Sequence, residues 1–284
     1  GNGGSHTITN GIDLTEGGLV WLKNRDRAVD HTFVDSERGI NKFLLSPDNS
    51  GEATNALVVT SFNTNGFSMN NGYTNGNYNG EDYASWTFLK SKRFFDIQTY
   101  SGTGSAGLTI NHDLGSIPGC IMVRRLDAGD GFQVYHRGSH PTAPEDYKSD
   151  LSTTMSFSND TMWNDFAPTD TQFQLGARDA GNKAGTNYVA YLFAHNDGDG
   201  EFGPDSDQDI IKCGSYTGNG SSTGPSVNLG FEPQWIMFKD TSATGDWQIM
   251  DVMRGLAVDG DDKVLQPNTN SAELTYTGGK VNIT

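Results

Sequence analysis

The chain has 284 residues, and its Lys+Arg 19 against Asp+Glu 35 give a formal net charge of −16. This charge excludes a nucleic-acid-binding protein and a protein drawn to anionic membranes, because both depend on clusters of Lys and Arg. No apolar run approaches the ~20 residues that a helix needs to cross a bilayer. Gly 36 and Pro 9, beside Trp 5, Tyr 10 and Phe 15, predict a folded chain with many tight turns.

The chain has two cysteines, Cys120 and Cys213, which are too few for a disulfide framework. Cys120 lies in an apolar run, so we expect a buried free thiol there. The first four residues, GNGG, contain neither an initiator Met nor an apolar signal segment. This start suggests a fragment or a trimmed product.

One pattern occurs three times along the chain. Each copy has a glycine turn, an apolar run that ends in a basic residue, a nearby acidic residue, and an alternating segment that ends in Arg-Gly. The first copy has these landmarks at residues 1–3, 19–23, 26 and 33–39. The second has them at residues 100–104, 120–124, 127 and 134–138, and the third at residues 216–220, 235–239, 240 and 249–255.

The first two copies also share a tail and a closing aromatic segment. The tails are residues 61–67 and 167–173, and the closing segments are residues 83–88 and 188–193. In the third copy, residues 263–268 and Glu273 match residues 42–49 and Glu52 of the first. We therefore expect the third copy to lack its closing strand.

The spacing of the copies predicts independent domains of ordinary size. Their glycine turns begin 102 − 1 = 101 and 218 − 102 = 116 residues apart, which is too long for the units of a solenoid. We place repeat 1 at residues 1–95, repeat 2 at 96–212 and repeat 3 at 213–284, with an acidic linker at 197–209. A string of such domains would form a rod.

The apolar runs are short, rich in β-branched and aromatic residues, and separated by Gly, Asn, Asp and Ser, as in strands joined by turns. Residues 120–123 are apolar without alternation, which predicts a central strand covered on both faces. Residues 132–137 alternate and predict a half-exposed strand. The sequence therefore predicts an all-β protein, a tandem array of β-sandwich domains with a jelly-roll-like topology as the alternative.

The acidic linker is a candidate calcium site. Ca²⁺ takes 6–8 oxygen ligands in forgiving geometry, and a flexible stretch rich in carboxylates supplies them. The spacing is not that of an EF-hand, because Phe202 and Gln208 stand where its Gly and Glu would be. A solvated linker is the alternative interpretation. The candidate ligands are Asp197, Asp199, Asp205, Asp207 and Asp209.

A loop at residues 63–82 is a candidate glycan-binding surface, since it consists almost entirely of Asn, Gly, Thr and Tyr. Amides form hydrogen bonds to sugars, and planar phenol rings stack on them. The candidate contacts are Tyr73, Asn75 and Tyr78. A simple low-complexity turn is the alternative.

The sequence gives little support for catalysis, because it contains no HExxH, GxSxG or Walker motif and no Cys/His metal spacing. The Gly-rich turn at residues 102–107 is followed by another strand-like segment, which argues against a dinucleotide site. Asp35 and Asp251 lie at matching repeat positions, where repeat 2 has His136. We interpret the two aspartates as strand-end hydrogen-bonding groups near the Arg of Arg-Gly. No catalytic residue is predicted.

Three motifs carry a resemblance to a known family: residues 17–26, the closing segment at 83–88, and the stretch from 214 to 237. Together they resemble the repeated-domain, tail-fibre-like virion proteins of tailed phages that infect marine bacteria, such as cyanophages and pelagiphages. The resemblance covers essentially the whole chain. It implies an extracellular virion appendage that is a homo-oligomer, with a trimer favoured, that contacts other virion proteins and reaches the host surface.

The leading hypothesis is therefore a fibre-like phage structural protein that attaches to a host surface polysaccharide, with avidity from many weak contacts. A capsid-surface decoration, or another tail component without receptor binding, is the second hypothesis. A polysaccharide depolymerase is a distant third, because carboxylate pairs for glycoside hydrolysis are defined only in space. No cofactor is expected apart from the candidate Ca²⁺.

Overall fold

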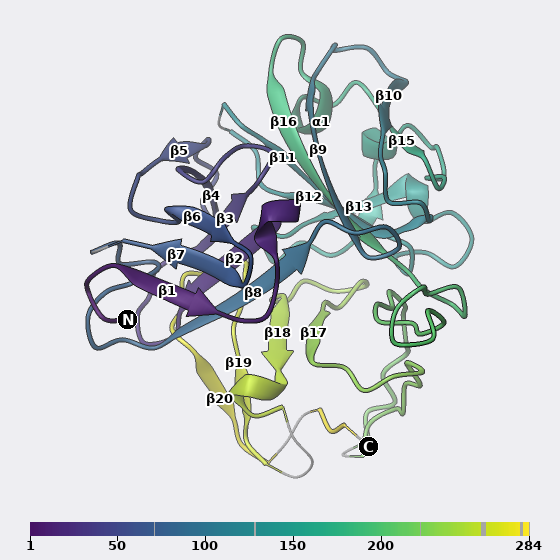
Figure 1. Ribbon diagram of the computed structural model, residues 1–284. Coiled ribbons are helices and arrows are strands. Elements are labelled where there is room, and N and C mark those ends of the chain that lie inside the picture. The colour runs from purple at the N-terminus through teal and green to yellow at the C-terminus, as the bar shows by residue number, and fades with distance from the viewer. Residues whose placement is uncertain (71, 128, 222, 257–259, 279–280, 284) are drawn as a thin grey trace.

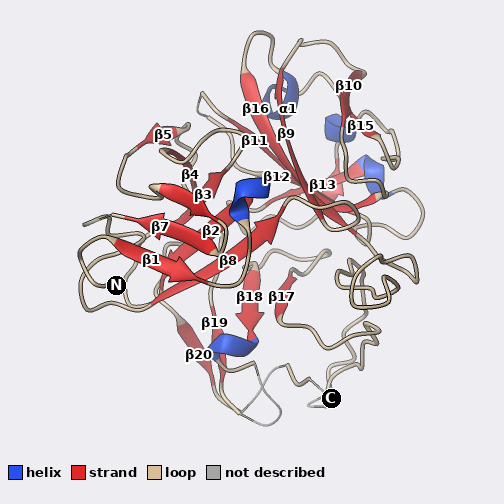
Figure 2. Ribbon diagram, in the orientation of Figure 1, coloured by secondary structure: helices blue, strands red, loops and turns tan. Residues whose placement is uncertain are grey.

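A computed structural model describes residues 1–70, 72–127, 129–221, 223–256, 260–278 and 281–283. It confirms the predicted all-β fold, in which strands joined by turns form separate antiparallel sheets (Figure 2). The described residues contain one α-helix, α1 (Asp179–Asn182). The short 3-10 helices are Leu14–Glu16, Pro144–Asp146, Thr161–Trp163 and Val252–Arg254.

Repeat 1 is a sandwich of two antiparallel sheets. The larger sheet has the order β5-β4-β3-β2-β8 and the smaller one the order β1-β7-β6. Val20, Phe67 and other buried side chains form a core between the two sheets. The strands are β1 (His6–Thr9), β2 (Gly18–Asn24), β3 (His31–Asp35), β4 (Lys42–Ser46), β5 (Ala53–Thr54), β6 (Ser61–Asn63), β7 (Gly66–Met69) and β8 (Tyr83–Leu89).

Repeat 2 has the same plan, but its large sheet has one strand more and its small sheet one strand fewer than in repeat 1. Its large sheet has the order β14-β13-β12-β11-β16-β9, and its small sheet consists of β10 and β15. β11 takes the place of β2, and β16 takes the place of β8. The strands are β9 (Phe95–Ser101), β10 (Leu108–Asn111), β11 (Pro118–Arg125), β12 (Gln133–His136), β13 (Tyr147–Asp150), β14 (Ser158–Asn159), β15 (Gln172–Leu175) and β16 (Asn187–Ala194).

In its described residues, repeat 3 shows only the first part of this plan. β17 (Trp235–Phe238) pairs with β18 (Gln248–Asp251), and β19 (Asp262–Val264) pairs with β20 (Leu274–Tyr276). A bridge between Ile249 and Leu265 joins the two pairs. Across the described part of the chain, no strand pairs with the outer edge of β17, where β8 and β16 lie in the other repeats.

The central strand of each complete repeat is buried on both faces. In β2, Val20 and Leu22 face the core of repeat 1, whereas Leu19 and Trp21 face a second core shared with the other repeats. β11 divides its residues in the same way, which confirms the prediction for residues 120–123. Cys120 is one of these residues and is a buried free thiol, as expected.

The prediction of a half-exposed strand at residues 132–137 was wrong. Tyr135 is 3% exposed and packs in the core of repeat 2, while Gln133 is 3% exposed. Gln133 donates a hydrogen bond to Asp150 and accepts one from Lys148. The alternation of this strand therefore separates two buried faces: Phe132 and Val134 lie in the shared core, and Tyr135 lies in the core of repeat 2.

The three repeats are packed around one centre and do not form the expected rod. Phe33 of repeat 1 lies 4.8 Å from Phe132 of repeat 2, measured between ring centroids. Phe88 lies 5.7 Å from Trp235 of repeat 3. In Figure 1 the purple and blue strands, the teal strands and the yellow-green strands surround a common middle. The apolar outer faces of the large sheets cover one another, so the repeats depend on each other for burial.

We predict that Phe33→Ala lowers the free energy of unfolding by about 3–5 kcal/mol, the usual cost of truncating a buried Phe. Because Phe33 contacts repeat 2, amides of β12 and β16 should also exchange faster in this variant. Chemical denaturation and hydrogen exchange measured by mass spectrometry test both effects.

Phe67→Ala is the matched control, since Phe67 is equally buried but lies in the core of repeat 1 alone. It should cost similar stability without a direct effect on β12 and β16. The same exchange pattern in both variants would contradict the shared core.

Candidate functional site

The most regular polar feature of the molecule is a set of three backbone hydrogen bonds that join the repeats in a closed ring. Each donor precedes the outer strand β5, β14 or β20, and each acceptor lies two residues after the basic residue that ends an apolar run. The bonds are Glu52 N–H to Leu126 O at 2.8 Å, Phe157 N–H to Thr241 O at 3.1 Å, and Glu273 N–H to Arg25 O at 2.8 Å. Repeat 1 thus bonds to repeat 2, repeat 2 to repeat 3, and repeat 3 to repeat 1.

The basic residue of each apolar run holds the loop that supplies the acceptor. Lys23 donates to the carbonyl oxygens of Asn24 and Arg27, at 2.7 and 3.1 Å. Lys239 makes the matching bonds within repeat 3, to the carbonyl oxygens one and four residues later. Burial lowers the pKa of Lys23 to about 8. Both lysines make the same two bonds, so each one holds the backbone of the loop that follows its strand.

Arg124 has the same place in repeat 2 and also reaches across to repeat 1. Its guanidinium donates to the carbonyl oxygens of Asp48 and Ser50, at 2.8 and 2.6 Å. It also donates to the carbonyl of Asp130 in its own loop. A planar group with several donors can serve both repeats at once, which a lysine cannot do as readily.

The interpretation of Asp35 as a strand-end hydrogen-bonding group is confirmed. Its carboxylate accepts from the backbone N–H and from Nε of Arg38, at 2.9 and 2.6 Å. The Arg38 guanidinium also donates to the carbonyl of Phe33 and to Glu52. Both side chains of the Asp35–Arg38 pair are at most 1% exposed. The arginine of the Arg-Gly motif therefore connects the end of β3 to Glu52, the residue whose N–H bonds to repeat 2.

Repeat 3 reproduces this arrangement atom for atom. Asp251 accepts from the backbone N–H and from Nε of Arg254 at 3.0 and 2.6 Å. Arg254 also donates to the carbonyl of Ile249 and to Glu273. Repeat 2 has His136 at this position, and its Nδ1 accepts from the N–H of Gly138.

Side chains of the closing strands connect the Asp–Arg pairs to a neighbouring repeat. Tyr191 in β16 donates its hydroxyl hydrogen to Asp35 at 2.8 Å. Trp86 in β8 donates its indole N–H to Asp251 at 3.0 Å. The two donors lie at equivalent positions, since Trp86 is opposite Trp21 and Tyr191 is opposite Met122 in the central strands. Repeat 2 is thereby linked to repeat 1, and repeat 1 to repeat 3.

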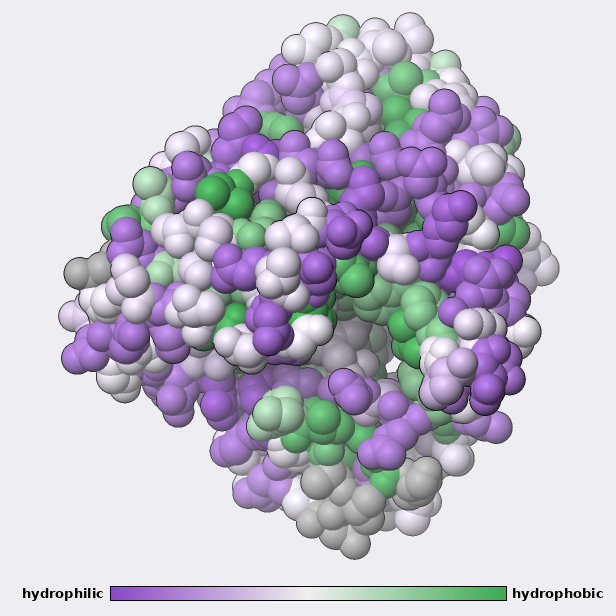
Figure 3. All heavy atoms as spheres, viewed as in Figure 1, coloured by the Kyte–Doolittle hydropathy of each residue, from purple (hydrophilic) through white to green (hydrophobic). Residues whose placement is uncertain are grey.

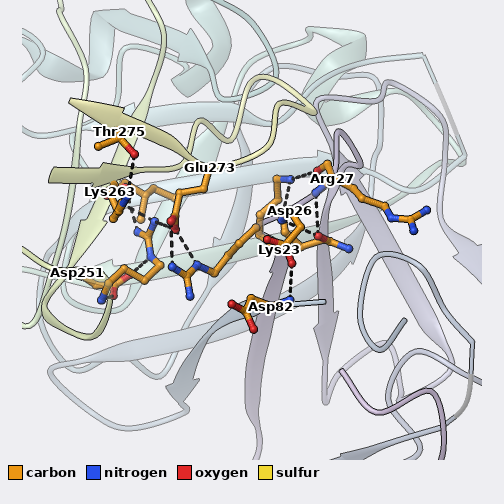
Figure 4. A network of polar contacts seen from close by, with 12 residues as sticks. Lys23, Asp26, Arg27, Asp82, Asp251, Lys263, Glu273 and Thr275 are labelled. Atoms are coloured by element: carbon orange, nitrogen blue, oxygen red, sulfur yellow. Dashed lines mark hydrogen bonds and ion pairs between the residues drawn. The ribbon is translucent and has the colours of Figure 1, made fainter. Parts of the chain in front are cut away.

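The contact between repeats 1 and 3 has an additional ion network, shown in Figure 4. Arg25 binds Glu273 through two hydrogen bonds, at 2.8 and 2.9 Å. Glu273 also accepts from Arg254, which in turn binds Asp251. Burial alone would raise the pKa of the Glu273 carboxyl, but the two guanidinium groups hold it below its usual value. The carboxylate form is therefore the one that joins the repeats.

The structure directs the carboxylates of the acidic linker toward separate partners. Asp197 pairs with Lys212, and Asp199 pairs with Arg93. Asp209 accepts from the backbone N–H groups of Gly198 and Gly200. Asp205 and Asp207 lie exposed. Within the described ranges, no three His, Cys, Asp or Glu side chains are arranged to hold a metal ion.

Of the candidate glycan contacts, Tyr73 and Asn75 are half-buried and Tyr78 is exposed. Tyr73 packs against Phe43 with ring centroids 5.5 Å apart, and burial raises its pKa to about 12. Asn75 donates to the carbonyl of Asp30. Tyr78 is 41% exposed, and the Arg27 guanidinium lies 4.4 Å from its ring centroid. Of the two rings, that of Tyr78 is therefore the more open to a ligand.

Sequence reasoning missed the donors Trp86 and Tyr191 and the bridging role of Arg25. The signal for the first two was present, because the closing segments align and each carries a hydrogen-bond donor at the same place. Their partners lie in other repeats, so the alignment of copies could not reveal the contact. Arg25 has no charged counterpart in repeat 2, where Leu126 stands.

Comparison with known proteins gives one family. A family model described as a domain of unknown function (DUF7483) matches residues 1–284. No curated protein and no solved structure matches the chain.

We predict that Asp35→Asn destabilises the protein by about 3–5 kcal/mol, because it removes the nearer of the two carboxylates that pair with the buried charge of Arg38 and leaves Glu52 alone at 3.2 Å. Asn keeps the size of the side chain, so the loss reports the charge. The midpoint of urea unfolding measures it.

Asp160→Asn is the control for this variant, since it breaks a pair with Arg178, whose side chain is 58% exposed. Its expected cost is about 0–1 kcal/mol. Equal small losses in both variants would show that the buried pair contributes no more than a surface pair.

A second prediction concerns pH. Because the folded-state pKa of Glu273 lies below its ordinary value of 4.5, its contribution to stability is present above that pH and is lost as the pH falls through the folded-state pKa. Glu273→Gln should therefore be less stable than the wild type at pH 7, and the difference should shrink at acid pH. Thermal unfolding of both proteins across this range tests it, and a difference independent of pH would contradict it.

Proposed function

The chain belongs to the DUF7483 family, and we propose that it is a non-enzymatic structural module of a phage virion appendage of the tail-fibre type. In this proposal the protein is extracellular on the particle, assembles with further copies and other virion proteins, and presents its loops to the surface of the bacterial host. A trimer is the proposed homo-oligomer.

The observation that supports the proposal best is how the buried polar side chains are used. The buried ion pairs Asp35–Arg38 and Asp251–Arg254 lie at strand ends. Each aspartate also accepts a hydrogen bond from a side chain of a neighbouring repeat. Such contacts join the three repeats into one cooperative unit. A particle component outside a cell needs cohesion of this kind because nothing replaces it after it unfolds.

The surface is compatible with a component present in many copies. A net charge of −16 disfavours non-specific association at high local concentration. Tyr78 offers an exposed ring in a loop rich in amides, which suits weak stacking on a sugar. Many such contacts on one particle would add up through avidity.

Immunogold electron microscopy of intact virions, with antibody raised against residues 1–284, tests the proposal. Gold at the distal tail is the expected result. Gold over the head would identify a capsid-surface protein, and virions without label would remove the virion assignment altogether.

A second arm tests the surface contact with host polysaccharide. Tyr78→Ala should weaken binding about fivefold, since a ring contact contributes on the order of 1 kcal/mol. Tyr73→Phe is the control, because this change keeps the half-buried ring that packs against Phe43 and should leave binding unchanged. Equal binding by Tyr78→Ala and the wild type would remove Tyr78 from the proposal, and release of reducing ends would favour a depolymerase.

A further inference from the structure

The outer edge of β17 differs from the same edge in the other two repeats. β2 pairs along this edge with β8 over seven residues, from Gly18 opposite Leu89 to Asn24 opposite Tyr83. β11 pairs in the same way with β16. β17 pairs with β18 on its inner side, and in the described ranges nothing pairs with it on the outer side.

The side chains of β17 are correspondingly less well covered. Every residue of β2 is buried, and so is all of β11 except its last residue, whereas all four residues of β17 are half-buried. The buried indole nitrogen of Trp235 has no hydrogen-bond partner. Figure 3 shows a hollow in this region, bordered by hydrophobic residues. β2 and β11 lie inside their sheets, whereas the equivalent strand β17 is a half-covered edge.

Two other segments of repeat 3 also differ from their counterparts in repeat 2. In repeat 2, β9 pairs with β16, and β10 pairs with β15. The matching segments of repeat 3, residues 211–217 and 223–229, form no strand. Each of these segments has a counterpart in repeat 2 that is a strand with a paired neighbour, whereas in repeat 3 no such neighbour is present in the described residues. In repeat 2 the partners of these two segments are β15 and β16.

We propose that the outer edge of β17 binds one further antiparallel strand of the β8 and β16 type, carried by a partner polypeptide, by β-strand addition. This surface is separate from the loop of Tyr78, and the proposal does not depend on the proposed function. Strand addition obtains affinity from backbone hydrogen bonds and specificity from alternate side chains, and both are defined at this edge.

The backbone groups available for the added strand follow from the pairing with β18. Val252 N–H donates to Gln234 O at 3.0 Å, so Gln234 and Val252 are a hydrogen-bonded pair. Because such pairs alternate in antiparallel sheets, Ile236 bonds to β18, and the N–H and C=O groups of Trp235 and Met237 point outward. Leu19 and Trp21 are the equivalent residues of β2, and their backbone groups point toward β8.

The side chains that the partner must carry follow from the two occupied edges. The residues that face the shared core are Trp86 and Phe88 in β8, and Val189, Tyr191 and Phe193 in β16. Trp86 and Tyr191 each bind the aspartate of a neighbouring repeat. Continuing the ring, the added strand would reach His136, which is the residue of repeat 2 equivalent to those aspartates. The partner is therefore an extended segment with alternate aromatic residues, one of which has a polar group.

A synthetic peptide that copies residues 187–196 (NYVAYLFAHN), labelled with a fluorophore, tests the proposal by fluorescence anisotropy. We expect saturable binding of one peptide per chain and slower hydrogen exchange of the amides of Trp235 and Met237. A peptide with Ser in place of Tyr191 and Phe193 should bind at least about tenfold more weakly, since it loses two large apolar side chains.

Two protein variants separate edge pairing from general stickiness. Met237→Pro removes an outward N–H without removing a bond to β18, and proline is tolerated at such an edge. It should weaken binding at least about tenfold. Met237→Leu keeps the N–H and should bind like the wild type, and circular dichroism checks that both variants are folded.

Three outcomes would overturn the proposal. They are no saturable binding by the wild type, undiminished binding by a folded Met237→Pro variant, and binding without protection of Trp235 and Met237. Sedimentation gives a further check, because a dimer of this chain that protects the same amides would replace the partner polypeptide by a second copy. If Met237→Pro fails to fold, the exchange measurement on the wild type still decides.

Discussion

Burial of the central strand on both faces is the constraint on which the architecture depends. Val20 and Ile121 face the sandwich core of their own repeat, while Trp21 and Met122 face the core that the repeats share. Such a strand cannot be stable in an isolated sandwich, since one face of its sheet would expose large apolar side chains. The repeats therefore surround one centre, and the shared core gains about 1.5–3 kcal/mol for each large side chain removed from water.

The polar contacts give this apolar assembly a defined order. A hydrophobic face is not directional, and it would allow the repeats to slide against one another. The ring of backbone bonds at Leu126, Thr241 and Arg25 fixes which edge meets which. Tyr191 and Trp86 then connect a closing strand to the Asp–Arg pair of a neighbour, where an unpaired buried charge would be costly. The contact that would reach His136 is the one for which the chain supplies no strand in its described part.

Much of the fold and part of the site could be read before the structure was known. Repeated landmarks located the strands, and the paired position of Asp35 and Asp251 indicated hydrogen bonding at strand ends. The rod was wrong because it assumed water beyond each large sheet, whereas another repeat covers that face. The half-exposed strand at residues 132–137 was wrong because its second face lies inside repeat 2, where Tyr135 joins the core and Gln133 binds Asp150 and Lys148. The contact of half-buried Tyr73 with Phe43 could not be read from the sequence either.

The sequence by itself determined the local features: the order of the repeats, the strands, and the polar residues that end them. These follow from periodicity, residue type and turn chemistry, which act over a few neighbouring residues. Tertiary structure alone decided that Glu273 binds Arg25 and that Trp86 binds Asp251, because these pairs are 248 and 165 residues apart in the chain. Residues so distant are brought together only by the packing of whole sheets, and that packing leaves no periodic signal in the sequence.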